Sequence, residues 1–191
     1  PMEVGMSSWF SPGGQILRHF VVIIGGLIVA GVAGGLVFLY SGVFNVAATV
    51  PDSRLLSWVL VTARESSVAR HARDVPAPPA DYVANRDNGF RLYRQQCVMC
   101  HTPIGREPEP MAVGFNPQAP TFGPDADDMD ATELFWVTKN GIRFTGMPAW
   151  GPSMTDAEIW DITAFLTTLP EMTAAYYDEI DARVPDTAAM P

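Results

Sequence analysis

The sequence predicts an all-α protein in which a single N-terminal transmembrane helix precedes a small helical domain. Two observations indicate helices. Residues 20–40 contain no charged side chain, and a later segment repeats apolar residues at helical spacing between a capping motif and a proline. A third observation argues against sheets, because no stretch of any length alternates apolar and polar residues as a strand does.

The N-terminal part is expected to anchor the chain in a membrane. Residues 1–15 have no regular pattern and are expected to be an irregular leader, followed by a transmembrane anchor over residues 16–42. At about 1.5 Å per residue, the uncharged run from Phe20 to Tyr40 makes roughly 31 Å of helix, which matches the hydrocarbon core of a bilayer. A cleaved signal peptide is the alternative, but its apolar region is usually about 7–15 residues long. We therefore expect a retained anchor.

Small residues inside this span suggest a contact with another helix. Gly31 and Gly35 form a small-x-x-x-small pair, which allows two helices to approach closely. The alternative is that these glycines only reflect the frequency of glycine in membrane helices.

Residues 43–80 are expected to contain a helix and then a proline-rich connector. Asp52 or Ser53 can cap a helix over residues 52–73, whose first half is crowded with apolar residues around Trp58. This composition fits a helix that lies at the membrane interface or against another subunit. The alternative is a spacer that packs on the following domain. Residues 75–80 (VPAPPA) are too rich in proline for a helix, so we place a domain boundary there.

The charge of the chain is divided unevenly. Residues 81–191 carry 17 Asp and Glu against 7 Lys and Arg, a net charge of −10, whereas residues 1–80 have a net charge of +1. An acidic domain would be repelled by phosphates, so nucleic acid is not an expected partner. We expect instead a protein partner with a basic docking surface.

The motif Cys97-Val98-Met99-Cys100-His101 contains the only two cysteines of the chain. Two cysteines separated by two residues and followed by histidine suit the covalent attachment of a c-type haem, because the thiols add to its vinyl groups and the imidazole binds the iron. A disulfide, a thioredoxin-like pair and half of a zinc site are the alternatives. The other histidines, His19 and His71, lie far upstream, so further zinc ligands are not apparent.

Residues 81–170 are expected to form one helical domain around this motif. Helices are predicted over residues 85–96 and 131–140, and a third begins at a Thr155–Glu158 capping box and ends before Pro170. The segment between His101 and Asp130 is rich in proline and glycine, and it is long for a loop unless it wraps around a cofactor. Residues 171–191 are expected to be an acidic, partly disordered C-terminal tail.

Residues 85–170 resemble the monohaem class I cytochromes c. The resemblance rests on Gly89, Tyr93 and the cysteine–histidine motif, then on Met147-Pro148 and on Phe165 with its neighbours. It implies that Gly89 and Tyr93 of the first helix cross Phe165 of the last one, with Trp160 nearby. It also implies a proline whose carbonyl orients the proximal histidine, and both Pro117 and Pro120 are candidates. With the span and the connector, the chain is similar to the membrane-anchored members of this family.

The expected sixth ligand of the iron is Met147. It lies on a glycine-flanked segment, and the following Pro148 disfavours helix there, so the thioether is free to reach the iron opposite His101. Met111, Met154 and His71 are the alternatives. The expected cofactor is one covalent haem c, held by Cys97, Cys100, His101 and Met147, with the last two as the iron ligands.

The resemblance implies an electron carrier and not an enzyme in its own right. We expect a subunit of a respiratory or other membrane redox complex. One alternative is a free-standing tethered shuttle between a quinol-oxidising complex and a terminal oxidase; another is a haem-based sensor or small-ligand binder. Four arginines that follow the span would keep the domain cytoplasmic by the positive-inside rule, but haem attachment in this family takes place on the outer face. We therefore expect a bacterial inner-membrane protein with a periplasmic haem domain.

Overall fold

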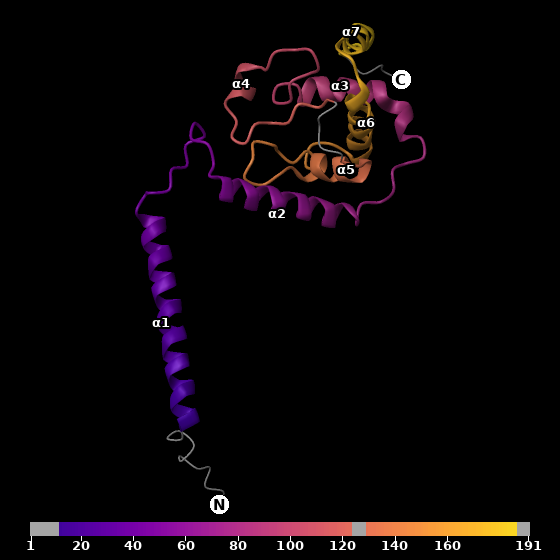
Figure 1. Ribbon diagram of the computed structural model, residues 1–191. Helices are drawn as coiled ribbons and strands as arrows, with labels where there is room; N and C mark the ends of the chain where they lie inside the picture. The colour runs from indigo at the N-terminus through magenta and orange to yellow at the C-terminus, as the bar shows by residue number, and fades with distance from the viewer. Residues whose placement is uncertain (1–11, 124–128, 187–191) are drawn as a thin grey trace, which may run out of the picture. The chain divides into compact units, whose positions relative to one another are not determined.

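The computed structural model describes residues 12–123 and 129–186, and every regular element in these ranges is a helix. This confirms the all-α prediction. The chain divides into two compact units, Pro1–Val50 and Pro51–Pro191, which we describe separately (Figure 1). Six helices of the second unit matter for its architecture: α2 (Arg54–Ala72), α3 (Arg86–Gln96), α4 (Pro110–Val113), α5 (Ala131–Asn140), α6 (Asp156–Leu166) and α7 (Ala174–Arg183).

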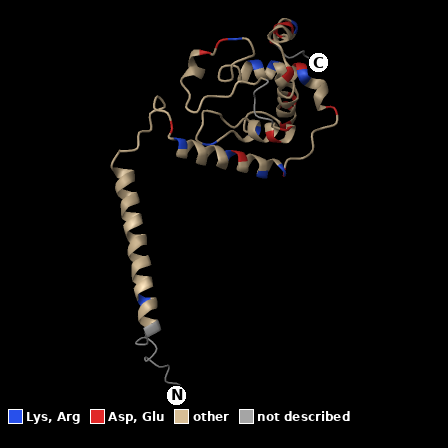
Figure 2. Ribbon diagram, in the orientation of Figure 1, with Lys and Arg blue, Asp and Glu red and all other residues tan. Residues whose placement is uncertain are grey.

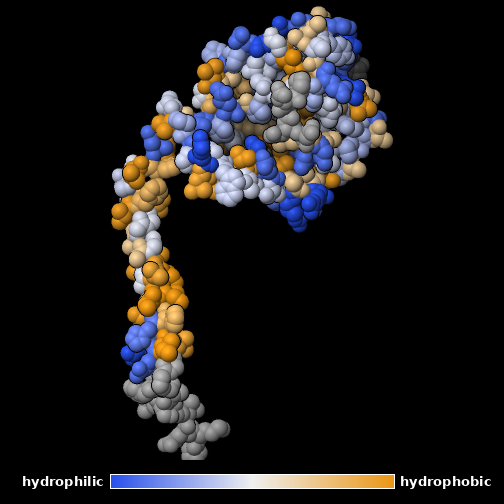
Figure 3. Space-filling view, in the orientation of Figure 1, coloured by the Kyte–Doolittle hydropathy of each residue, from blue (hydrophilic) through white to orange (hydrophobic). Residues whose placement is uncertain are grey.

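The first unit contains one long helix, α1 (Pro12–Tyr40). Its part from Gly14 to Tyr40 is long and apolar enough to cross a membrane, and Figure 3 shows hydrophobic residues along most of it. Side chains from residue 15 onward are exposed, and a Cβ added at Gly31 or Gly35 would meet no atom within 4 Å. A partner helix at this face stays a prediction. Of the expected leader over residues 1–15, residues 1–11 lie outside the described residues.

Helix α2 begins after Ser53, whose side chain accepts a hydrogen bond from the Leu56 N–H. Its C-terminal half packs on α5: Ala72 is buried, and the ring of His71 stacks on that of Trp136 with the centroids 5.5 Å apart. The second compact unit starts at Pro51 and includes α2. The domain boundary that we placed at the proline-rich connector stays a prediction. The helix packs on the domain as the spacer alternative requires, and its buried residues, Val68 and Ala72, lie in this half.

The crossing of α3 and α6 forms the centre of the second unit. A Cβ at Gly89 would overlap the carbonyl oxygen of Asp161, so the two backbones meet there. One turn later, the ring centroids of Tyr93 and Phe165 lie 5.0 Å apart. Both contacts agree with the resemblance. Trp160 belongs to a second cluster, where its ring stacks on that of Phe135 of α5 at 4.2 Å.

Capping boxes form at the N-termini of α5 and α6, the two helices that contribute to the second cluster. Thr155 and Glu158 close the start of α6 as expected, and Asp130 with Glu133 does the same for α5. Since each box satisfies backbone N–H groups that the helix itself leaves free, α5 and α6 begin at defined residues. The loop that carries Met147 lies between these two helices.

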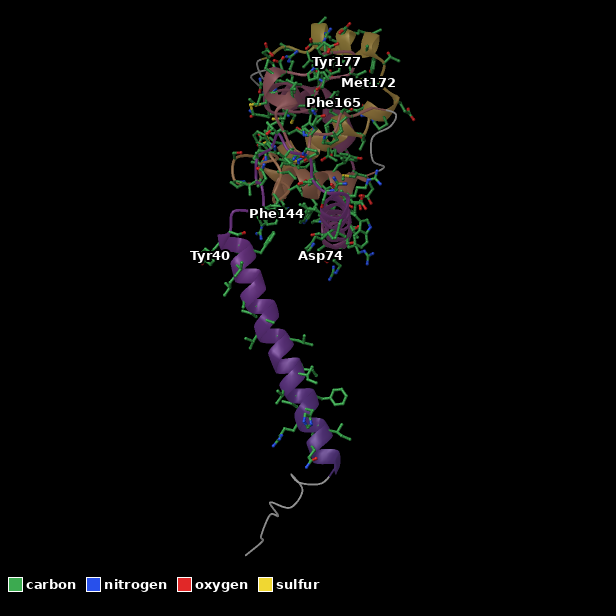
Figure 4. All side chains as sticks on the ribbon, turned by 60° about the vertical axis from the view of Figure 1, so that its left-hand side comes forward. Tyr40, Asp74, Phe144, Phe165, Met172 and Tyr177 are labelled. Carbon is green, nitrogen blue, oxygen red and sulfur yellow. The ribbon has the colours of Figure 1, made fainter. Side chains whose placement is uncertain are left out.

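The C-terminal segment, expected to be an acidic and partly disordered tail over residues 171–191, contains a helix, and residues 187–191 lie outside the described residues. Residues 174–183 form helix α7, and Tyr177, Ile180 and Val184 are buried. This spacing places the three side chains on one helix face, which packs into the main core. Phe165, Met172 and Tyr177, labelled in Figure 4, belong to that core. Three acidic residues of the segment, Asp178, Asp181 and Asp186, pair with arginines of the domain, which composition alone does not reveal.

Arg94 of α3 connects this last helix to the core. Its guanidinium donates to the Asp181 carboxylate at 2.8 Å and to the Val184 carbonyl at 2.9 Å, and it pairs with Asp186 at 2.6 Å. The hydrogen bond to Asp181 is the main reason why the pKa of Arg94 is raised.

We expect Arg94→Met to lower the free energy of unfolding by about 2 kcal/mol, since hydrogen bonds to charged groups contribute roughly 1.5–3 kcal/mol. Chemical denaturation of the full chain in detergent, followed by near-UV circular dichroism, measures this loss. Arg70→Met is the matched control, because the Arg70 side chain is 65% exposed and its pair with Asp74 is 3.5 Å long; its expected loss is below about 0.5 kcal/mol. Equal losses in the two variants would contradict a structural role for Arg94.

Candidate functional site

The cysteine–histidine motif forms a tight turn at the C-terminal end of α3. The N–H of Cys97 donates to the carbonyl of Tyr93 at 2.8 Å and continues the helix. The N–H groups of Cys100 and His101 then both donate to the carbonyl of Cys97, at 3.0 and 2.8 Å. The turn therefore brings two thiols and an imidazole together. Both cysteines are partly buried and neither is in a disulfide.

His101 is held in one tautomer. Its Nδ1 lies 2.9 Å from the carbonyl oxygen of Pro120. A carbonyl can only accept, so Nδ1 carries the proton and the lone pair remains on Nε2. His101 is only 8% exposed, and burial lowers its pKa, although the hydrogen bond to Pro120 opposes the shift. The imidazole is thus neutral and can act as a metal ligand through Nε2. Of the two candidate prolines, Pro120 and not Pro117 supplies the carbonyl.

Phe122 is a part of the site that the sequence analysis missed. Its ring stacks on that of His101, with 4.7 Å between the centroids, and meets the ring of Tyr93 edge-on at 6.4 Å. The Tyr93 hydroxyl donates to the carbonyl of His101 at 3.5 Å, and burial raises the pKa of Tyr93, so the hydroxyl keeps its proton. The signal in the sequence that could have identified Phe122 is its position, an aromatic residue two positions after Pro120.

Met147 lies in a loop that is tied to the end of α5. Its carbonyl accepts from the Ile142 N–H at 3.3 Å, and its own N–H donates to the Thr145 hydroxyl oxygen at 3.1 Å. Gly141 has a φ of +65°, and a Cβ there would meet the carbonyl oxygen of Met147 at 2.8 Å. Only glycine fits that position without strain. These contacts fix the backbone at a partly buried methionine.

The same loop contacts the segment that follows α4. A Cβ at Gly146 would lie 2.6 Å from the ring of Phe115, so this ring packs directly on the backbone beside Met147. Phe144, labelled in Figure 4, points away from the domain and is 81% exposed. It also has a φ of +64°, which is uncommon for a bulky residue.

The other candidate ligands lie in different surroundings. Met111 is exposed on α4, and Met154 packs against both core clusters. His71 stacks on Trp136, and its Nδ1 is 2.7 Å from the carbonyl of Ser67. Met154 and His71 therefore already contact other parts of the domain, whereas the backbone of Met147 is fixed by hydrogen bonds within its own loop. The choice of Met147 remains a prediction.

The environment of the cysteines also bears on the alternative uses of the motif. Burial, with a smaller contribution from Cys100, raises the pKa of the Cys97 thiol to about 12. A thioredoxin-like cysteine needs a lowered pKa, because the thiolate is the reactive form. Within residues 12–123 and 129–186, no group of three or more His, Cys, Asp and Glu side chains is arranged to hold a metal ion. Two free thiols and a neutral imidazole fit a covalently attached haem better than either alternative.

Comparison with protein families agrees with this site. Residues 84–166 match the family described as cytochrome c oxidase, cbb3-type, subunit III. These residues form a class I c-type cytochrome domain. The cytochrome domain extends from the start of α3 to the end of α6 and includes both the cysteine–histidine motif and the Met147 loop. The cytochrome c family carries covalently bound haem c and transfers electrons. No curated protein and no solved structure matched the chain.

Proposed function

We propose that this protein is a membrane-anchored electron carrier with one haem c, attached through Cys97 and Cys100 and ligated by His101 and Met147. The observation that carries the proposal is the arrangement of His101, which follows two free thiols and whose Nδ1–H donates to the Pro120 carbonyl, so that Nε2 keeps its lone pair. The haem, when bound, supplies a one-electron ferric/ferrous couple. His101 and Met147 would fill both axial positions, so no position stays open for a substrate.

Two features of the chain would tune the potential. A thioether ligand raises the reduction potential relative to a second imidazole, which suits donation to a high-potential acceptor. The hydrogen bond from His101 to Pro120 sets the orientation and basicity of the proximal imidazole. The rigid turn at one side and the tied loop at the other would keep the ligands in place as the charge on the iron changes.

The surroundings of the domain suggest how electrons reach it. The apolar helix α1 supports a single-pass anchor. We place the haem domain on the periplasmic side of a bacterial inner membrane, because c-type haem attachment in this family takes place on the outer face. The family description names an oxidase subunit, which favours a permanent subunit of a respiratory or other membrane redox complex over a free shuttle. The net charge of −10 over residues 81–191 suits a basic partner and predicts that association slows as salt rises. Migration as a lone small protein after detergent extraction and size exclusion would contradict the subunit role.

The test of the proposal is covalent haem staining of the chain after denaturation. We expect the stain to stay with the 20.8 kDa chain and to be lost in the variant with Cys97→Ser and Cys100→Ser together. A stain absent from the native sequence would refute the proposal, provided that the chain is expressed with the machinery for c-type haem attachment. Prompt and complete binding of carbon monoxide by the reduced protein at neutral pH would instead favour a sensor or ligand binder.

A further inference from the structure

The first half of α2 presents an apolar face that the second unit does not cover. Leu55, Trp58 and Val59 are 70%, 65% and 46% exposed, respectively. Their spacing of three and four residues places them on one side of the helix. Val68 and Ala72, which are buried against the domain, lie on another side. The buried residues of the helix therefore lie in its second half, whereas its first half exposes most of its apolar side chains.

Charge indicates what covers this face. Residues 52–74 carry four arginines against three acidic residues, a net charge of +1: Arg54, Arg64, Arg70 and Arg73, with Asp52, Glu65 and Asp74. Arg64 pairs with Glu65 and Arg70 with Asp74, whereas the rest of the second unit is strongly acidic. Figure 2 shows these basic residues along α2, whereas α7 carries mostly acidic ones. Anionic lipid headgroups attract basic segments and repel the acidic rest of the unit. A helix with exposed leucine, tryptophan and valine beside arginines has the composition of an interfacial membrane helix.

The chain itself keeps α2 close to a membrane. Only residues 41–53 separate the end of α1 from the start of α2. Fully extended, this linker reaches at most about 45 Å. It also contains exposed apolar residues, namely Val43, Phe44 and Val46. If α1 spans a bilayer, α2 is within reach of its surface at all times.

We propose that the first half of α2 lies in the headgroup region of an anionic membrane, with Leu55, Trp58 and Val59 directed toward the acyl chains. The inference rests on the membrane anchor of the proposed function. Tryptophan at position 58 suits this depth, because its ring is apolar and its N–H can reach water. Arg54, at the start of this half, lies beside the phosphates.

This docking has a consequence for the haem domain. The other half of α2 is packed on α5 through Val68 and Ala72 and through the stacked rings of His71 and Trp136. A helix held in the membrane at one end and on the domain at the other restricts the rotation of the domain. The cytochrome domain is therefore presented to its partners in a limited set of orientations and does not swing freely on a tether.

The full, haem-loaded chain in vesicles of phosphatidylglycerol and phosphatidylethanolamine tests this docking. The probe is a phosphatidylglycerol with a diazirine placed near the headgroup end of its acyl chain. After illumination and trypsin digestion, cleavage at Arg54 and Arg64 isolates the peptide 55–64, and cleavage at Arg143 and Arg183 isolates the peptide 144–183, which contains α6 and α7. We expect lipid adducts on the first peptide to exceed those on the second about tenfold or more.

Two variants make the test specific. Trp58→Glu should reduce the adducts on peptide 55–64 several-fold, since it places a charge in the apolar face. Ser66→Glu introduces the same charge at an exposed position two turns later on that side of the helix and should leave the adducts unchanged. Adducts on the α1 peptide but none on peptide 55–64 would overturn the inference and leave the anchor intact. Absence of adducts from both peptides would refute the anchor itself, and haem staining of the same sample reports on the carrier function independently.

Discussion

Replacing Gly89 by alanine should lower the free energy of unfolding by about 3 kcal/mol or more, the upper part of the range for overpacked cores. The added Cβ would overlap the carbonyl oxygen of Asp161, which belongs to the backbone of α6 and cannot rotate away. The two helices would have to separate at the point where they cross. In an exposed helix, replacing glycine by alanine would raise the free energy of unfolding by roughly 0.5–1 kcal/mol. The close helix crossing therefore makes a normally stabilising substitution destabilising.

Denaturation of the full chain in detergent, followed by near-UV circular dichroism, measures this effect. Gly114→Ala is the matched control, since a Cβ at that position would make an ordinary contact of 3.6 Å with the carbonyl oxygen of Met111. We expect the control to change the stability by less than about 1 kcal/mol. If the Gly89 variant proved as stable as the native chain, the close crossing of α3 and α6 would be wrong.

Met147→Ala should lower the reduction potential by on the order of 100 mV or more, given that axial ligands move haem potentials over about 0.8 V. The variant removes the thioether that we assign to the sixth position. With that position open, the reduced protein should also bind carbon monoxide. Met147 is only partly buried, so the domain should remain folded and the potential can be measured by redox titration.

Two matched variants decide whether the correct methionine has been chosen. Met111 is 53% exposed on α4, and Met111→Ala should leave both potential and stability unchanged. Met154 packs against both core clusters, so Met154→Ala should lower the stability by about 2 kcal/mol or more and leave the potential nearly unchanged. A fall in potential in either variant, together with an unchanged potential in Met147→Ala, would assign the ligand elsewhere.

Much of the fold followed from local signals. The Thr155–Glu158 capping box and the glycine after Asn140 predicted the start of α6 and the end of α5, because caps depend on a few adjacent residues. The same holds for the uncharged run that became most of α1. The crossing of Gly89 with α6 came instead from the resemblance, since a glycine in one helix does not identify the helix that approaches it.

The local composition was misleading where long-range packing decided the structure. Residues 171–191 were interpreted as a tail because they carry five acidic residues against one basic residue, yet Tyr177 and Ile180 of α7 and the following Val184 are buried. Only the position of Arg94 on α3 explains why the acidic side chains Asp181 and Asp186 are held there. Similarly, nothing near His71 in the sequence indicated that it would stack on Trp136.

The sequence by itself determined the chemistry that we propose for this protein: Cys97, Cys100 and His101 form one local motif, and an uncharged run of the length of a bilayer needs no distant partner to be recognised. Only the tertiary structure decided which carbonyl orients His101. Pro117 and Pro120 are equivalent as sequence, and the geometry of the loop brings the carbonyl of Pro120 to 2.9 Å from Nδ1. Tertiary structure likewise divided α2 into a packed and an exposed half, because burial depends on which surfaces meet and cannot be read from composition.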